Sequence, residues 1–137
     1  MALYEYEHTE TTAAPASVVW PLWTDTARWP EWDGGLREVV LDGPFEAGTR
    51  GTMTMPDQPP IPFTLTAVDD GRGFTDETRL PDATLVFEHW LEDIDDGTRI
   101  VYRVTVDGPP ELGPAVTEDT PDAMRALARL AEASLRA

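Results

Sequence analysis

Seven short segments of this chain carry the residue pattern of β-strands, and this pattern limits the possible folds more than any other feature. The segments are 2–12, 36–42, 50–55, 62–68, 74–80, 84–92 and 98–106. Neighbouring side chains in a strand point to opposite faces, so alternation of polar and apolar residues predicts strands with one buried face. Short turns rich in Gly, Pro and Asp join most of the segments. The sequence therefore predicts an antiparallel meander with one apolar face.

Helices are expected in two places. A first short helix opens at Ala14-Pro15-Ala16-Ser17 and is interrupted by Pro21, and a second is capped by Asp25 and stopped by Pro30. In the tail, apolar residues fall on one face at helical spacing: Met124, Leu127, Ala128, Ala131 and Leu135. Packing this stripe on the apolar face of the sheet buries both surfaces.

The charge balance limits the partners. The 137 residues include 26 Asp and Glu against 10 Arg and Lys, which gives a formal net charge of −16. Such a field repels phosphate backbones and anionic lipid headgroups, so we expect neither nucleic-acid binding nor membrane insertion. The length predicts a single domain over residues 1–137. The charged N-terminus does not resemble a signal peptide or a spanning helix, so a cytoplasmic location is expected.

Missing residue types narrow the chemistry. The chain has no Cys, Lys or Asn, and its only histidines are His8 and His89. A thiolate nucleophile, a Schiff-base lysine and a three-histidine zinc site are therefore excluded. We expect no metal and no cofactor, and any catalysis would use carboxylates, His89, Tyr, Arg or Thr.

Several short motifs follow one another in a characteristic order. Ala14-Pro15-Ala16-Ser17-Val18-Val19-Trp20 precedes Trp29-Pro30-Glu31-Trp32, Leu41-Asp42-Gly43-Pro44-Phe45 and Gly97-Thr98-Arg99, and the final strand leads into Asp107-Gly108-Pro109. In this order they resemble the SRPBCC superfamily, which includes START domains and birch-pollen-allergen-like proteins. The most similar members are bacterial polyketide cyclase/dehydrase and lipid-transport domains, and the resemblance spans nearly the whole chain.

The resemblance implies an α+β helix-grip fold. In this fold a curved antiparallel sheet of six to seven strands wraps around a long C-terminal helix, with two short helices between strands 1 and 2. It also implies a ligand cavity between sheet and helix. Thr120-Pro121-Asp122 has the local pattern of a helix start, whereas the family implies a helix from about Leu112 with a kink at Pro121.

Strand parity places two polar residues on the inner face. In 84–92, His89 shares a face with Leu85, Phe87 and Leu91, and in 98–106, Tyr102 shares one with Ile100, Val104 and Val106. One register sets His89 opposite Tyr102, Glu88 opposite Arg103 and Glu92 opposite Arg99. A tighter Asp96-Gly97 turn would shift it by two residues and bring Trp90 over Arg103. Both registers keep His89 and Tyr102 inward, either as hydrogen-bonded core residues or as acid–base groups.

Further candidates lie around the expected cavity. Asp33 follows the aromatic residue Trp32 at its mouth, and burial there would raise the pKa of Asp33. Parity does not decide whether Glu77 and Arg79 or Asp76 and Thr78 face inward. The candidate ligand-binding residues are Trp32, Met53, Met55, Phe63, Leu65, Phe87, His89, Tyr102, Met124 and Leu127.

Three functions are compatible with these residues. The first is binding of a hydrophobic, aromatic, polyketide-like or lipid-like molecule. The second is a polyketide aromatase/cyclase or dehydratase that uses His89, with Tyr102 or Asp33, as acid–base groups. The third is a chaperone-regulator type of interaction module that meets a basic partner through its acidic surface. The oligomeric state is expected to be a monomer or a homodimer.

Overall fold

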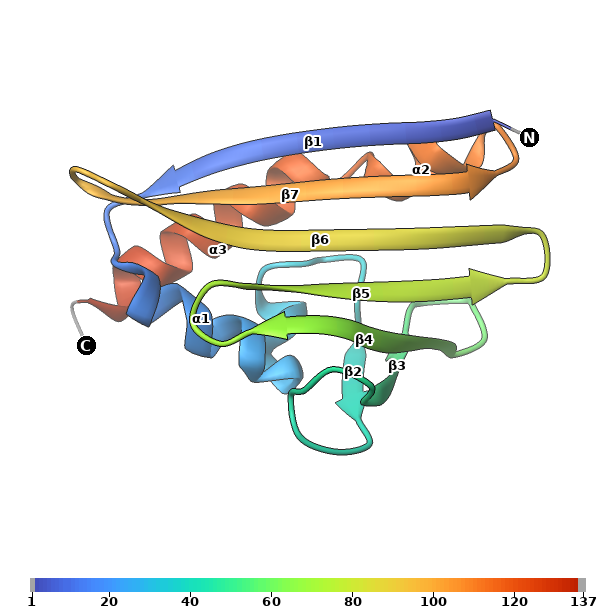
Figure 1. The fold of residues 1–137 in the computed structure, drawn as a ribbon, viewed down its shortest axis with the longest axis horizontal. Coiled ribbons are helices and arrows are strands. Elements are labelled where there is room, and N and C mark those ends of the chain that lie inside the picture. The colour runs from blue at the N-terminus through green and yellow to red at the C-terminus, as the bar shows by residue number, and fades with distance from the viewer. Residues whose placement is uncertain (1, 136–137) are drawn as a thin grey trace.

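The computed structural model describes residues 2–135 and contains one sheet and four helical segments (Figure 1). The strands are β1 (Ala2–Thr12), β2 (Glu38–Leu41), β3 (Arg50–Thr54), β4 (Ile61–Asp69), β5 (Gly73–Leu80), β6 (Ala83–Ile94) and β7 (Gly97–Gly108). The helical segments are α1 (Ala16–Thr24), the 3-10 helix η1 (Thr26–Glu31), α2 (Leu112–Thr117) and α3 (Thr120–Ser134). Among these helices, none combines the length and hydrophobicity needed to cross a membrane.

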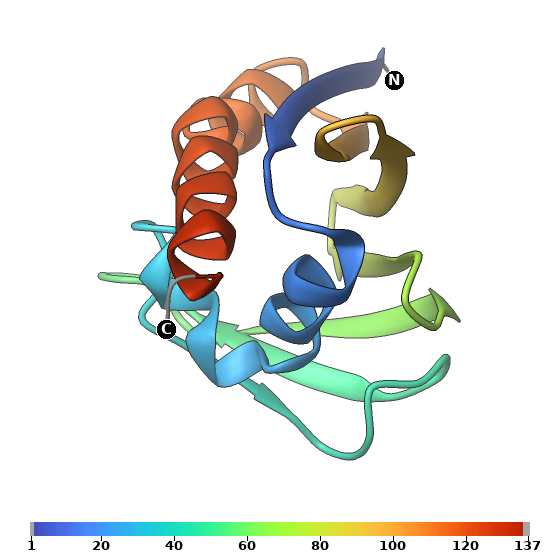
Figure 2. The ribbon, with the colours of Figure 1, turned by 90° about the vertical axis from the view of Figure 1, so that its left-hand side faces the viewer.

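All seven strands form one antiparallel sheet in the order β1-β7-β6-β5-β4-β3-β2. The sheet curves, and α3 lies across its open side, while α1 and η1 close one end (Figure 2). The predicted helix-grip arrangement is confirmed, with seven strands and two short helices between β1 and β2. The core consists of the inner face of the sheet, the apolar side of α3 and the buried residues of α1 and η1.

The hairpin of β6 and β7 adopts the first of the two registers considered. His89 pairs with Tyr102, Glu88 with Arg103 and Glu92 with Arg99, because Asp95 and Asp96 form the turn. Arg99 and Glu92 form the expected ion pair at 3.1 Å. Arg103 instead pairs with Glu7 of β1 at 3.0 Å and lies over the Trp90 ring. Strand β7 lies between β1 and β6, so Arg103 has a carboxylate on each side.

The C-terminal helix begins at Leu112, as the family implies, but it is interrupted at Glu118 and Asp119. Pro121 lies in the first turn of α3, where its missing N–H leaves no hydrogen bond unmade. The structure thus contains both predicted features: a helix that begins at Leu112, as the resemblance implies, and a second helix that begins at Thr120, as the local pattern predicts.

Two details differ from the sequence prediction. Pro30 does not stop the second helix, because η1 continues to Glu31. Proline removes only its own N–H, and the backbone N–H groups of Trp32 and Asp33 both still donate to the Trp29 carbonyl. Leu135 does not belong to the buried stripe, because α3 ends at Ser134 and Leu135 is 48% exposed.

Gly113 lets α2 approach β1. A Cβ at this position would overlap the Tyr4 ring, whose hydroxyl lies 2.8 Å from Thr117 Oγ1. We expect Gly113→Ala to lower the free energy of unfolding by about 1–3 kcal/mol, because the backbone must shift to accommodate the methyl group. Chemical denaturation measures the change. Gly34→Ala is the matched control, since its Cβ would meet nothing within 4 Å. Equal stability of the two variants would contradict this packing.

Candidate functional site

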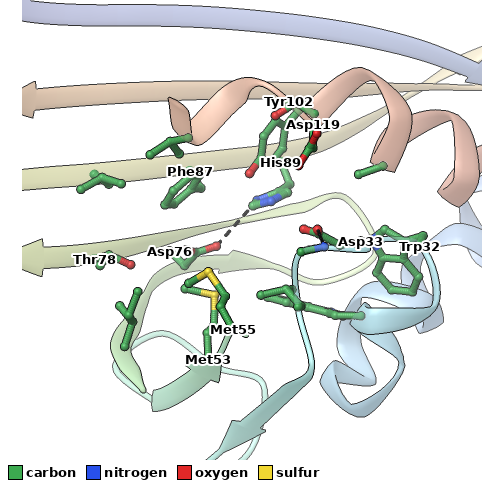
Figure 3. A pocket seen from close by; sticks show the side chains of 18 of the residues that line it. Trp32, Asp33, Met53, Met55, Asp76, Thr78, Phe87, His89, Tyr102 and Asp119 are labelled. Carbon is green, nitrogen blue, oxygen red and sulfur yellow. Dashed lines mark hydrogen bonds and ion pairs between the residues drawn. The ribbon is translucent and has the colours of Figure 1, made fainter. Parts of the chain in front are cut away.

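A cavity of about 610 Å³ lies between the inner face of the sheet, η1, the β3–β4 turn and the helices α2 and α3 (Figure 3). Its volume falls in the range of small-molecule sites. Most of its wall is apolar or aromatic. Nine of the predicted residues line it: Trp32, Asp33, Met53, Met55, Phe87, His89, Tyr102, Met124 and Leu127.

Phe63 and Leu65 point inward from β4 but are not among the lining residues. Both are almost completely buried in the core, where the Phe63 ring stacks on Trp29 with 6.2 Å between ring centroids. The helices α1 and η1 cover this end of the sheet. An inward-facing residue there packs against a helix rather than against the cavity.

His89 is enclosed by aromatic rings. It stacks on Phe74 at 4.1 Å and meets Tyr102 edge-on at 4.5 Å. Its Nδ1 lies 3.4 Å from the Phe74 carbonyl oxygen. A carbonyl can only accept a hydrogen bond, so Nδ1 carries the proton and Nε2 is left as an acceptor. Burial lowers the pKa of His89 to about 3. The imidazole is therefore uncharged at neutral pH.

Asp76 is a buried cavity residue that sequence reasoning did not select. It lies on β5, is 4% exposed, and its Oδ2 is 4.0 Å from His89 Nδ1. Among the described residues, no hydrogen bond reaches its carboxyl group. Burial raises the pKa of Asp76 to about 8. At neutral pH the group is mostly a carboxylic acid that can donate a hydrogen bond.

The register of β5 and β6 decides the question that parity left open. Phe74 pairs with His89, Asp76 with Phe87 and Thr78 with Leu85, so these β5 residues share the inner face. Glu77 and Arg79 lie on the outer face and form an ion pair with each other. The sequence does contain a signal that could have identified Asp76. A two-residue turn at Pro81-Asp82 sets which β5 residue pairs with which β6 residue, and the inward-facing residues of β6 were already predicted, so the inward-facing residues of β5 follow.

Tyr102 and Thr78 add two hydroxyl groups to the same surface. Burial raises the pKa of Tyr102 well above its ordinary value, so its phenol stays protonated. Thr78 Oγ1 is buried and has no hydrogen-bond partner in residues 2–135. We call Asp76, Thr78, His89 and Tyr102 the polar floor. It offers three O–H donors and one nitrogen acceptor, all uncharged at neutral pH.

Asp33 and Asp119 line the cavity from two different elements (Figure 3). Asp33 follows η1, and its Oδ1 accepts a hydrogen bond of 3.1 Å from the Gly35 backbone N–H. Burial raises the pKa of Asp33, the Gly35 hydrogen bond lowers it, and Asp119 raises it further. Asp119 is at the break between α2 and α3 and is exposed. Within the described part of the chain, no group of three His, Asp or Glu side chains is arranged to hold a metal.

The chain is similar to a known family in sequence and to known proteins in fold. A family model described as "Polyketide cyclase / dehydrase and lipid transport" matches residues 5–137. No curated protein matches the chain.

Solved structures share the fold at low sequence identity. Ara h 8.0201 is 16% identical, with a TM-score of 0.77 over 95% of this chain and 98% of that one. Norcoclaurine synthase from Thalictrum flavum, solved with dopamine and hydroxybenzaldehyde, is 16% identical, with a TM-score of 0.72 over 94% and 86%. The di-domain ARO/CYC StfQ from the steffimycin biosynthetic pathway is 13% identical, with a TM-score of 0.78 over 98% of this chain and 52% of StfQ. These likenesses establish the fold alone.

The two shifted pKa values make opposite contributions to stability. Between pH 6.5 and 8 the unfolded chain has lost the Asp76 proton and the folded chain keeps it, so stability falls as the pH rises. Between pH 3 and 6.5 the unfolded chain protonates His89 and the folded chain does not, so stability rises with pH. Between pH 3.8 and 6.5 the two contributions offset each other.

We predict that Asp76→Asn abolishes the loss of stability above pH 6.5. The free energy of unfolding of the unmodified chain should fall by about 1–2 kcal/mol between pH 6.5 and 8, relative to this variant. Urea denaturation at several pH values measures the difference, and Asp42→Asn, at an exposed position, is the control. Parallel pH profiles for Asp76→Asn and the unmodified chain would contradict a protonated Asp76.

Proposed function

We propose that this chain, which belongs to the polyketide cyclase/dehydrase and lipid transport family, binds a hydrophobic small molecule with an aromatic or polycyclic core in its cavity. The observation that carries the proposal is a cavity of about 610 Å³ whose walls are largely apolar, with several aromatic rings and a small number of polar groups.

The walls suit a flat ligand. Trp29, Trp32 and Phe87 provide rigid aromatic surfaces, and aromatic contacts add about 0.5–1.5 kcal/mol beyond area burial. Met53 and Met55 adapt to irregular outlines because their side chains are flexible. Burial of apolar ligand surface contributes about 25 cal/mol per Å² before the costs of ordering. The polar floor then orients the ligand through a few hydrogen bonds.

One of the similar structures supports an aromatic ligand class. Norcoclaurine synthase was solved with dopamine and hydroxybenzaldehyde, both aromatic. These two ligands belong to norcoclaurine synthase, and they make aromatic probes the first choice for this chain.

Filling the cavity should abolish binding. Ala123 lines the cavity from α3, and Ala126, on the same helix and also half-buried, does not. We expect the neutral dye Nile red to bind saturably at one site, and Ala123→Phe to weaken it at least about tenfold by occupying ligand volume. Fluorescence titration measures the affinity. An equal loss in Ala126→Phe, or no loss in Ala123→Phe, would contradict binding in this cavity.

A second candidate function is acid–base catalysis on a carbonyl compound, and the environment of Asp76 favours it. A proton-transfer group works best with a pKa near the working pH, and burial brings the pKa of Asp76 to about 8. His89, whose pKa is lowered to about 3, is a much weaker base and would act as a neutral hydrogen-bonding group.

The reaction would be enolisation followed by cyclisation or dehydration. The Asp76 carboxylate takes the proton α to a ketone, and the C–H electron pair moves into the enolate. Tyr102 donates a hydrogen bond to the enolate oxygen. The enolate carbon then attacks a second carbonyl of the same ligand, whose oxygen is protonated by the acid form of Asp76. Asp33, at the other side of the cavity, is the alternative proton donor.

Deuterium exchange separates catalysis from binding. We expect the protein to accelerate exchange of the α-protons of 2-tetralone in D₂O, with a half-maximal rate near pH 8, because the base form of Asp76 accumulates there. Proton NMR follows the exchange. Asp76→Asn should lower the catalysed rate at least about a hundredfold while Nile red still binds. Exchange in Asp76→Asn at the unmodified rate would rule out this role.

A further inference from the structure

The ionisable residues of the cavity are unbalanced in charge. Within residues 2–135, the lining contains Asp33, Asp76, Asp119, His89 and Tyr102, and no Arg. The chain has no Lys at all. His89 and Tyr102 are uncharged at neutral pH for the reasons given above. Every formal charge that the lining can carry at this pH is therefore negative, and a bound carboxylate or phosphate would meet no cationic partner.

The negative charges lie at the mouth. Exposed residues of the lining mark the opening, namely Gly35, Pro56, Gln58, Ala115 and Asp119. Asp33 is half-buried two residues before Gly35. In the described residues, neither Asp33 nor Asp119 has a basic partner within ion-pair distance. Burial is the main cause of the raised pKa of Asp33, and charge repulsion from Asp119 adds to it.

The helix break places Asp119 at this position. Asp119 is the N-cap residue of α3, and Asp122 follows in the first turn. The positive end of the helix dipole favours negative charge here, and these two residues already supply it. The N-terminus of α3 is thus compensated by the chain's own carboxyl groups, which leaves little attraction for an anionic ligand.

An independent observation on the floor points to an oxygen-bearing ligand. Thr78 Oγ1 is buried at the cavity without a hydrogen-bond partner in the described chain, and the carboxyl of Asp76, 4% exposed, also accepts no donor. An unmade hydrogen bond of a buried group costs about 1–3 kcal/mol, so a ligand that completes these bonds is favoured. Uncharged oxygen, in a hydroxyl or a carbonyl, suits them because it requires no counter-charge.

We infer that the ligand of this cavity is a protonated aromatic amine, with its ammonium group between Asp33 and Asp119 and a hydroxyl or carbonyl oxygen directed to the floor. The inference rests on the proposed binding function. A cation at the mouth relieves the repulsion between the two carboxylates and makes charge-assisted hydrogen bonds with them. The half-buried Trp32 ring beside Asp33 adds a cation–π surface. A carboxylate in the same place would add a third negative charge.

Three indoles that differ only in the end group test the inference: tryptamine, tryptophol and indole-3-propionate. Isothermal titration of the full chain at pH 7 and low salt measures each affinity. We expect tryptamine to bind at least about tenfold more tightly than tryptophol, since charge-assisted hydrogen bonds are the stronger kind. Indole-3-propionate should bind most weakly. Equal affinity of tryptamine and tryptophol, or tighter binding of indole-3-propionate, would overturn the inference.

Charge variants separate the mouth from the overall field of the protein. The double variant Asp33→Asn/Asp119→Asn should lose the preference for tryptamine over tryptophol, because no carboxylate remains at the mouth to bond the ammonium group. Glu118→Gln removes a neighbouring charge that does not line the cavity and should keep the preference. An equal loss in Glu118→Gln would assign the preference to the net charge of −16 and contradict the inference. Nile red binding confirms that each variant is folded.

The outcomes also distinguish this inference from the proposed function. Saturable binding of Nile red without preference for tryptamine overturns the amine assignment and leaves the ligand-binding function standing. Failure of both Nile red and all three indoles to bind overturns both.

Discussion

The close contact between the C-terminal half of α3 and the first strand sets the geometry of the whole molecule. Ala128 and Ala131 are almost fully buried there, and small side chains let the helix come near. Thr12 Oγ1, at the end of β1, donates to the Ala128 carbonyl of α3 at 3.0 Å. Because α3 is held at this end, the break at Glu118 and Asp119 lets its other end and α2 stand over the cavity instead of filling it.

The cavity has two electrostatic zones because of this arrangement. Its floor lies deep between β5, β6, β7 and the helices, where the cost of desolvation keeps both Asp76 and His89 uncharged. Its mouth lies where the chain reaches solvent at the loop after η1 and at the helix break, and there Asp33 and Asp119 supply negative charge. The floor offers hydrogen bonds to uncharged groups, and the mouth offers hydrogen bonds to a charged group. This arrangement favours a ligand with an uncharged polar group at one end and a charged group at the other, and it does so both for simple binding and for catalysis.

The sequence predicted the elements that depend on local pattern. Period-two alternation placed His89 and Tyr102 on the inner face in both registers considered, and the structure has the register that sets them opposite each other. The same reasoning failed where two strand faces look alike. Both faces of β5 carry charged residues, so the burial of Asp76 emerged only from its pairing with β6. Strand parity also did not distinguish residues of the cavity wall from residues of the core. Phe63 and Leu65 point inward, but η1 and α1 cover them. Helix placement is tertiary information that periodicity within one strand does not contain.

Titration of the Asp76 carboxyl group by carbon-13 NMR tests the account most directly, because both the binding and the catalytic proposals require a polar floor kept away from water. In the free protein the Asp76 signal should titrate with a pKa near 8. A pKa of Asp76 near 4 would mean a hydrated floor and an ionised carboxylate at neutral pH, and it would contradict the account.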